Sequence, residues 1–70
     1  MRYYIVKDFG GKTGYVKSND FFFRPSWITD LSDATVFEGG SEEEIRTRFQ
    51  GKIRSDAMFV PAEVYEVMVS

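Results

Sequence analysis

The chain has 70 residues with 9 basic and 11 acidic side chains, a net charge of −2, and neither histidine nor cysteine. A chain of this length forms one domain, residues 1–70, and its composition excludes disulfides, thiol nucleophiles and the usual zinc ligands. Because histidine, the commonest general base, is also missing, we expect no catalytic activity, no metal and no cofactor.

The sequence is typical of a cytoplasmic protein. The absence of cysteine fits a reducing compartment. Met1 and Arg2 lead directly into a charged, alternating segment rather than an apolar leader, and no apolar run approaches the roughly 18 residues of a membrane span. We therefore expect a cytoplasmic protein without a membrane partner.

The first third of the chain is predicted to form short strands separated by turns. Residues 2–9, RYYIVKDF, carry apolar side chains on both faces of a strand, which is typical of a central position. The glycines of residues 10–14 indicate a turn, and residues 15–18 form the returning strand. A third short strand is predicted over residues 21–23. Pro25 should end its ladder because proline has no N–H.

The middle of the chain is predicted to be irregular over residues 26–34, with a further strand at residues 35–38. A helix follows. Ser41 and Glu44 have the spacing of a capping box, and glutamates occupy the first turn. Ile45 and Phe49 recur one turn apart and form the buried stripe of this helix, while the neighbouring arginines, Arg46 and Arg48, face solvent.

The last predicted element is a strand over residues 62–69, AEVYEVMV, which at a sheet edge could pair with a copy of itself or with a partner. The resulting order, β-β-β-(β)-α-β, predicts an α+β fold. We expect a small antiparallel sheet of about four strands with one helix packed on it.

Two stretches resemble ligand-binding motifs but lack the residues or the spacing that those motifs require. Gly11, Lys12 and Thr13 look like the end of a phosphate-binding loop, but Val6 stands where a glycine is required and a strand rather than a helix follows. The acidic residues between positions 30 and 44 match no calcium-loop spacing. A plain turn and a capped helix explain both stretches.

The aromatic stretch FFFRPSW, residues 21–27, is the main candidate for a binding surface. Phe21 and Phe23 point to one face of a strand and Phe22 to the other, so a single helix cannot cover all three. Part of this surface is then exposed or covered by a second chain, with Trp27 among the anchors. The candidate partner-binding residues are Tyr4, Lys17, Phe21, Phe23, Arg24 and Trp27.

Three functions fit these residues. The first is a protein-binding module, working alone or as a homodimer, in which Arg24 pairs with a partner carboxylate or stacks on a ring. The second is a single-stranded nucleic-acid binder that uses Tyr4, Tyr15, Lys17 and Arg24, although the net negative charge opposes non-specific phosphate binding. The third is a small-molecule or nucleotide-binding protein with its pocket at a dimer interface.

Two resemblances accompany these patterns. Residues 3–21, YYIVKDFGGKTGYVKSNDF, resemble a hairpin of bacterial SH3 domains, in which a strand leads into a GktGYV turn. A larger part of the chain resembles small uncharacterised proteins common in phage and prophage genomes, through the stretches YYIVKD, GYVKS, WITDLSDATVF and SEEEI. This second resemblance implies an accessory protein that binds a host protein, a class that includes inhibitors of bacterial defence systems.

Overall fold

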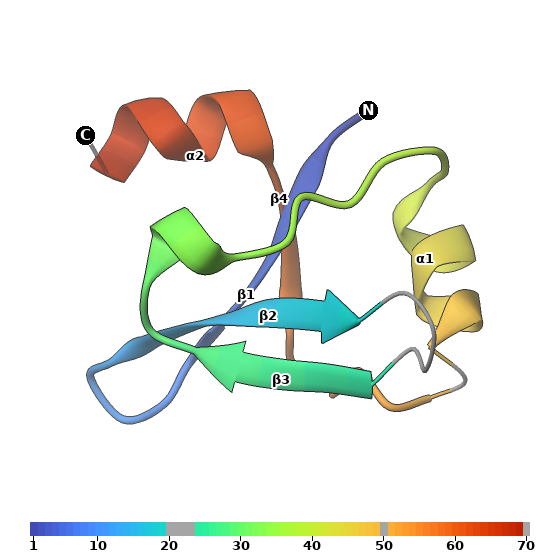
Figure 1. The fold of residues 1–70 in the computed structure, drawn as a ribbon, viewed down its shortest axis with the longest axis horizontal. Helices are drawn as coiled ribbons and strands as arrows, with labels where there is room; N and C mark the ends of the chain where they lie inside the picture. The colour runs from blue at the N-terminus through green and yellow to red at the C-terminus, as the bar shows by residue number, and fades with distance from the viewer. Residues whose placement is uncertain (20–23, 50, 70) are drawn as a thin grey trace.

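A computed structural model describes residues 1–19, 24–49 and 51–69, and shows one antiparallel sheet in the strand order β3-β2-β1-β4 together with two helices (Figure 1). The strands are β1 (Tyr3–Asp8), β2 (Thr13–Asn19), β3 (Arg24–Ile28) and β4 (Met58–Pro61). The helices are α1 (Glu42–Arg48) and α2 (Ala62–Val69), and Leu31–Asp33 form one 3-10 turn. The expected α+β fold is confirmed, with one helix more than predicted.

The turn between β1 and β2 follows the glycine pattern of the sequence. Gly10 and Gly11 both have positive φ, 64° and 98°, as a tight two-residue hairpin loop requires. The Phe9 N–H donates to the Lys12 carbonyl at 2.7 Å and closes the loop. The predicted turn at residues 10–14 is therefore confirmed at residues 10–12, whereas residues 13 and 14 already belong to β2. The turn fixes which side chains of β1 and β2 share a face.

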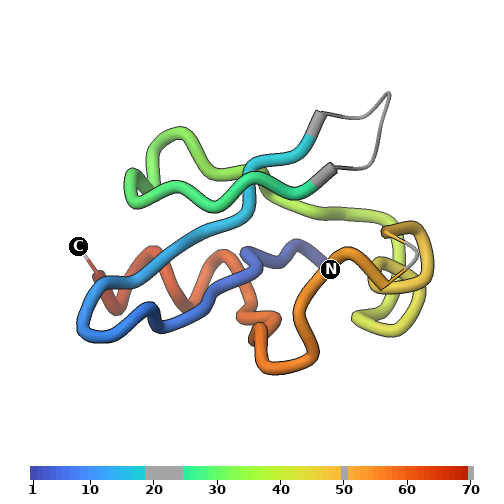
Figure 2. Tube along the Cα trace, turned by 90° about the horizontal axis from the view of Figure 1, so that it is seen from below, coloured from blue at the N-terminus to red at the C-terminus, as the bar shows by residue number. Residues whose placement is uncertain are grey.

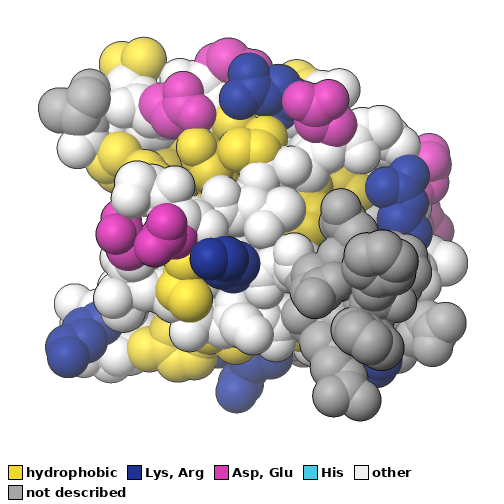
Figure 3. All heavy atoms as spheres, viewed as in Figure 1, with side chains coloured by type: hydrophobic (Ala, Val, Ile, Leu, Met, Phe, Trp, Pro, Cys, Tyr) yellow, Lys and Arg dark blue, Asp and Glu magenta, His cyan; other side chains and the backbone are white. Residues whose placement is uncertain are grey.

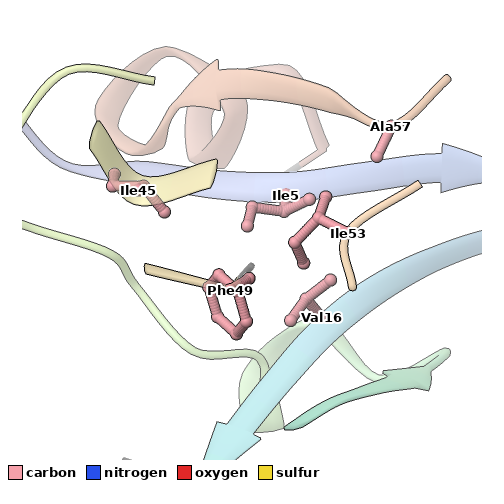
Figure 4. Packing of buried hydrophobic residues seen from close by; sticks show 6 residues of the cluster. All are labelled: Ile5, Val16, Ile45, Phe49, Ile53 and Ala57. Atoms are coloured by element: carbon pink, nitrogen blue, oxygen red, sulfur yellow. The ribbon is translucent and has the colours of Figure 1, made fainter. Parts of the chain in front are cut away.

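The central position predicted for the first strand is also confirmed, because β1 lies between β2 and β4 and is buried on both faces. Ile5 and Val16 belong to one hydrophobic cluster, which α1 and residues 53–57 cover (Figure 4). Val6 and Tyr15 belong to a second cluster on the opposite face, which α2 and the segment around Leu31 cover. The sheet therefore has a layer of packing on each side.

The second cluster contains a network of tyrosine hydroxyls that fastens α2 to the sheet. Tyr65 of α2 shares a 2.9 Å hydrogen bond with the hydroxyl of Tyr15 in β2. Tyr4 of β1 donates to Glu66 Oε1 at 2.8 Å, and its ring meets that of Tyr65 edge to face. Burial, followed by the hydrogen bond with Tyr15, raises the pKa of Tyr65 to about 12.

Beyond the pair Val6–Tyr15, β1 and β2 separate, and Figure 2 shows β2 rising away from β1 after their shared turn. Residues 35–37 make backbone contacts to both separated strands. On the β2 side, the Thr35 N–H donates to the Val16 carbonyl at 3.1 Å. Residues 35–37 therefore bond to backbone groups on the inner edges of both divergent strands.

The same segment corrects the strand predicted at residues 35–38. It forms one isolated bridge, in which Phe37 exchanges backbone hydrogen bonds of 2.8 and 2.9 Å with Tyr3. Thr35 contributes its side chain as well, since its Oγ1 accepts from the Ser18 N–H at 3.0 Å. A segment that bonds to two diverging strands cannot stay in register with either, and this limits it to a single bridge.

Pro25 does not end the sheet, which corrects the prediction made from it. It lies inside β3 opposite Ser18, whose N–H is used by Thr35 Oγ1 on the side away from β3. The Ser18–Pro25 pair is thus a non-hydrogen-bonded pair of the ladder, and the missing proline N–H faces out of the sheet. Part of the segment predicted as irregular, residues 26–28, is strand for this reason. The strand predicted at residues 21–23 lies outside the described residues.

Pro61 follows the same rule in β4, a strand that the sequence did not predict. The Ala62 N–H donates to the Arg2 carbonyl at 2.9 Å, so by alternation the pair Tyr3–Pro61 is non-hydrogen-bonded. Both prolines of the chain therefore occupy edge strands, at positions where a donor would have no partner in the sheet.

The strand predicted for the final segment, residues 62–69, is wrong, because this segment forms helix α2. Ala62 and Tyr65 lie one turn apart and face the sheet, with Ala62 completely buried. An eight-residue apolar stretch fits both a period of two and a period of 3.6, so its contacts with the sheet decide between them.

Helix α1 matches its prediction at the start. The Ser41 hydroxyl accepts from the Glu44 N–H at 3.3 Å, and Ile45 and Phe49 are buried. Arg46, however, is only partly exposed. Its guanidinium donates to the carbonyls of Ala57 (2.7 Å) and Arg54 (3.2 Å), and so ties the helix to the loop that precedes β4.

Candidate binding surface

A shallow surface hollow lies beside the β1–β2 turn, where Phe9 meets Trp27 of β3. Their rings are 5.2 Å apart at 69°, an edge-to-face arrangement. A β-carbon at Gly14 would stand 2.5 Å from the Phe9 ring, which shows that this ring lies directly over the glycine. A glycine in β2 therefore makes the room in which this aromatic pair forms.

A hollow of about 220 Å³ lies next to this pair. Its lining includes Phe9, Trp27, Lys12, Gly14, Ile28 and Thr29. The hollow is smaller than the roughly 300–1,000 Å³ of typical small-molecule pockets. Its size therefore suits one apolar side chain better than a complete metabolite.

A cation stands behind the Phe9 ring. Lys7 Nζ lies 4.5 Å from the ring centroid and 3.3 Å from Asp56 Oδ2, so the ammonium is held between a π-face and a carboxylate. Partial desolvation acts to raise the pKa of Asp56, but the hydrogen bond and charge of Lys7, with Arg54, outweigh it and lower that pKa. The Lys7–Asp56 ion pair therefore packs against one face of the Phe9 ring.

The outer edge of β3 passes beside the hollow. Because Ser18–Pro25 is a non-hydrogen-bonded pair, the pair Val16–Trp27 is one as well. The Trp27 N–H and carbonyl therefore point out of the sheet, and within residues 1–19, 24–49 and 51–69 no backbone group bonds to them. Pro25 offers an outward carbonyl and no donor.

The structure brings together only part of the surface expected from the sequence. Trp27 borders the hollow and is half-buried, whereas Tyr4 is 6% exposed beneath α2, on the opposite face of the sheet. Lys17 is exposed and alternates with Val16, so it also faces away from Trp27. The backbone of Arg24 begins β3, while Phe21 and Phe23 lie outside the described residues.

Sequence reasoning missed Phe9, Lys12 and Gly14. The available signal was an aromatic residue directly before the glycine turn, with a further glycine on the returning strand. That spacing places Phe9 across from Lys12 and two positions along the strand from the Lys7–Gly14 pair, on the same face of the hairpin. The sequence alone did not indicate that β3 would bring Trp27 to the same place.

Among the described residues, no group of three or more acidic side chains is placed to hold a metal ion, and no helix is long and apolar enough to cross a membrane. No family model matches the chain, and no curated protein or solved structure matches it either. The resemblances to phage-type proteins and to an SH3 hairpin therefore stay predictions.

Proposed function

We propose that the chain is a non-catalytic protein-binding module that takes up an extended segment of a partner along the edge of β3. One apolar side chain of that segment enters the hollow beside Phe9 and Trp27. The observation that carries this proposal is the position of the hollow, which borders a strand edge whose Trp27 backbone groups point outward. Strand addition of this kind combines main-chain bonds with a side-chain pocket.

The edge supports a short contact. A partner residue opposite Trp27 forms two backbone hydrogen bonds, one to its N–H and one to its carbonyl. Pro25 accepts one more bond but donates none. Because so few main-chain bonds are available here, the affinity has to come mainly from the side chain in the hollow.

The hollow also indicates the chemistry of the partner segment. Its walls include two aromatic rings, which favour a large aliphatic or aromatic side chain. Lys12 lines it and has no salt bridge within the described part of the chain. An acidic residue beside the apolar anchor would complement this ammonium.

The geometry favours protein over single-stranded nucleic acid. The nucleic-acid alternative needs Tyr4 and Tyr15 on an open face for base stacking. Both rings are nearly buried, at 6% and 7% exposed, and their hydroxyls are bonded to α2 residues. Neither ring can stack on a base while α2 remains in place.

The test is a selection of short random peptides on the immobilised chain, followed by titration of the best synthetic peptide. We expect an enriched apolar–acidic motif, a change in Trp27 emission on binding, and slower hydrogen exchange at the Trp27 amide. Phe9→Ser should weaken binding about tenfold or more, whereas Lys17→Ser on the other face should leave it unchanged. Failure to enrich any motif, or equal binding by the Phe9 variant, would refute the proposal.

A further inference from the structure

The outward face of α2 is apolar, which is unusual for a helix at the surface. Ala62 is fully buried, and the opposite side of the helix carries residues spaced three and four apart. The side chains on that side are exposed to 56% at Val64, 75% at Val67 and 72% at Met68. A surface helix normally carries polar residues there, so this face has the composition of a covered one.

The size of the patch supports the same inference. Three contiguous, exposed aliphatic side chains on one helix present an apolar area on the order of a few hundred Å². Patches of this size on small proteins commonly mark interaction sites, whereas scattered single residues do not. Val64 and Met68, one turn apart, would be its centre.

Acidic groups flank this patch. Glu63 and Glu66 lie along one side of α2, and Arg2 salt-bridges both Glu63 (3.4 Å) and Glu38 (3.6 Å). Two carboxylates of α2 therefore lie beside the apolar face, and Arg2 links one of them to Glu38. In the view of Figure 3 acidic side chains lie over α2 at the upper left, with hydrophobic surface next to them.

We propose that the outward face of α2 docks a basic amphipathic helix from a partner protein. The apolar stripe of that helix would cover Val64 and Met68, and its lysines or arginines would face Glu63 and Glu66. Helix-in-groove and helix-on-helix recognition use anchors at this spacing. Charge complementarity then selects the orientation of the partner.

Two other occupants fit the charges less well. A second copy of the chain, packed antiparallel through the same face, would bring the glutamates of both helices to one side of the seam, where they repel each other. An anionic membrane surface attracts basic helices rather than acidic ones. The acidic flank therefore favours a basic protein segment.

This surface is separate from the one proposed above. The patch lies on α2, which covers the Tyr4 face of the sheet, while the hollow adjoins Trp27 on the side of the Ile5 cluster. The inference consequently does not depend on strand addition at β3. A partner helix and a partner strand could be tested one at a time.

The experiment uses a fluorescein-labelled helical peptide built from leucine and lysine, with leucines at heptad a and d positions. The matched control peptide carries glutamate in place of every lysine. We expect the lysine peptide to bind and the glutamate peptide not to bind, by fluorescence anisotropy. Met68→Gln and Val64→Thr should each weaken binding about tenfold.

The control is Met58→Gln, because Met58 is also exposed (60%) but belongs to β4. Circular dichroism and thermal melting show whether each variant keeps its fold. Equal loss in the Met58 and Met68 variants, or equal binding of both peptides, would overturn the proposal. A dimer that Met68→Gln dissociates, or binding to phosphatidylglycerol vesicles that the same change abolishes, would overturn it in favour of the other occupants.

Discussion

The Phe9 ring lies over Gly14 so closely that a β-carbon on the glycine would stand 2.5 Å from one ring atom and 2.8 Å from the next. The same β-carbon would stand 3.4 Å from the Trp27 ring, an ordinary contact. Because Gly14 has no β-carbon, the Phe9 ring can pack against its backbone and meet the Trp27 ring.

Gly14→Ala should displace the Phe9 ring and open the hollow. Loss of the edge-to-face pair and the strain of the added methyl group should cost about 1–2 kcal/mol of the free energy of unfolding. Trp27, the only tryptophan, should emit at longer wavelength as water reaches its ring. Thr13→Ala is the neighbouring control. An unchanged emission maximum in Gly14→Ala would contradict this account of the pair.

The bond between the hydroxyls of Tyr15 and Tyr65 should show as a coupling energy. Either single change to phenylalanine leaves one part-buried hydroxyl without its partner and should cost about 1 kcal/mol. The double change removes both groups, so it should cost less than the sum of the two. Urea denaturation of all four proteins measures the cycle, and strict additivity would show that the bond does not form in solution.

High pH should release α2 from the sheet. The pKa of Tyr65 is raised from 10.0 to about 12 by burial and then by the Tyr15 hydrogen bond, so the folded state favours its neutral form. This contribution to stability is complete below pH 10 and is lost as the pH rises to about 12. The hydrogen bond to Glu66, together with burial, raises the pKa of Tyr4 in the same direction.

The measurement is the urea midpoint as a function of pH, with helix content followed by circular dichroism. Tyr65→Phe should be less stable than the natural chain at neutral pH but should lose less stability above pH 10. Tyr3→Phe, whose hydroxyl contacts Met1 at the surface, serves as the control. A parallel pH dependence in the Tyr65 variant and the natural chain would show that another group controls the alkaline transition.

Arg46 should matter more than Arg48, although both lie in the last turn of α1. Arg46 donates to two carbonyls of the loop that precedes β4, and its guanidinium lies 4.9 Å from the centre of the Phe59 ring. Arg48 donates to the Gly39 carbonyl. Arg46→Lys loses the planar fork and should cost about 1–2 kcal/mol. Arg48→Lys should cost less than about 0.5 kcal/mol, and equal midpoints in thermal melting would contradict the assignment.

The capping box at the start of α1 gives the simplest test of a sequence signal. Ser41→Ala removes the acceptor for the Glu44 N–H and should cost about 1 kcal/mol of the free energy of unfolding. Ser41→Asp restores an acceptor and should recover most of that loss. Thermal melting of the three proteins decides this, and an alanine variant as stable as the aspartate variant would argue against the cap.

The parts of the fold that could be predicted are those fixed by neighbours in the sequence. Gly10 and Gly11 adopt the positive φ that their turn requires, and Ser41 caps the helix whose stripe is Ile45 and Phe49. Each signal acts over a few residues and does not depend on the rest of the chain. The double-sided burial of β1 was also evident, because apolar side chains occupy both faces of one strand.

The parts that could not be predicted depend on contacts distant in sequence. Pro25 does not disrupt the hydrogen bonding of the sheet, because the N–H of Ser18, its partner in β2, donates to Thr35 instead. The segment 62–69 becomes a helix through contacts such as Tyr65 with Tyr15. For the candidate site, the sequence pointed to Trp27 but not to its neighbour Phe9, because the register of β3 brings the two rings together.

The placement of the two prolines also affects how molecules of this chain meet one another. Open sheet edges invite growth by one strand per molecule, the first step toward fibrils. At Pro25 and Pro61, however, an approaching strand would meet a ring where it needs a donor. Each edge of the sheet therefore lacks a backbone donor at its proline, and a long hydrogen-bonded ladder between copies would be interrupted at both edges.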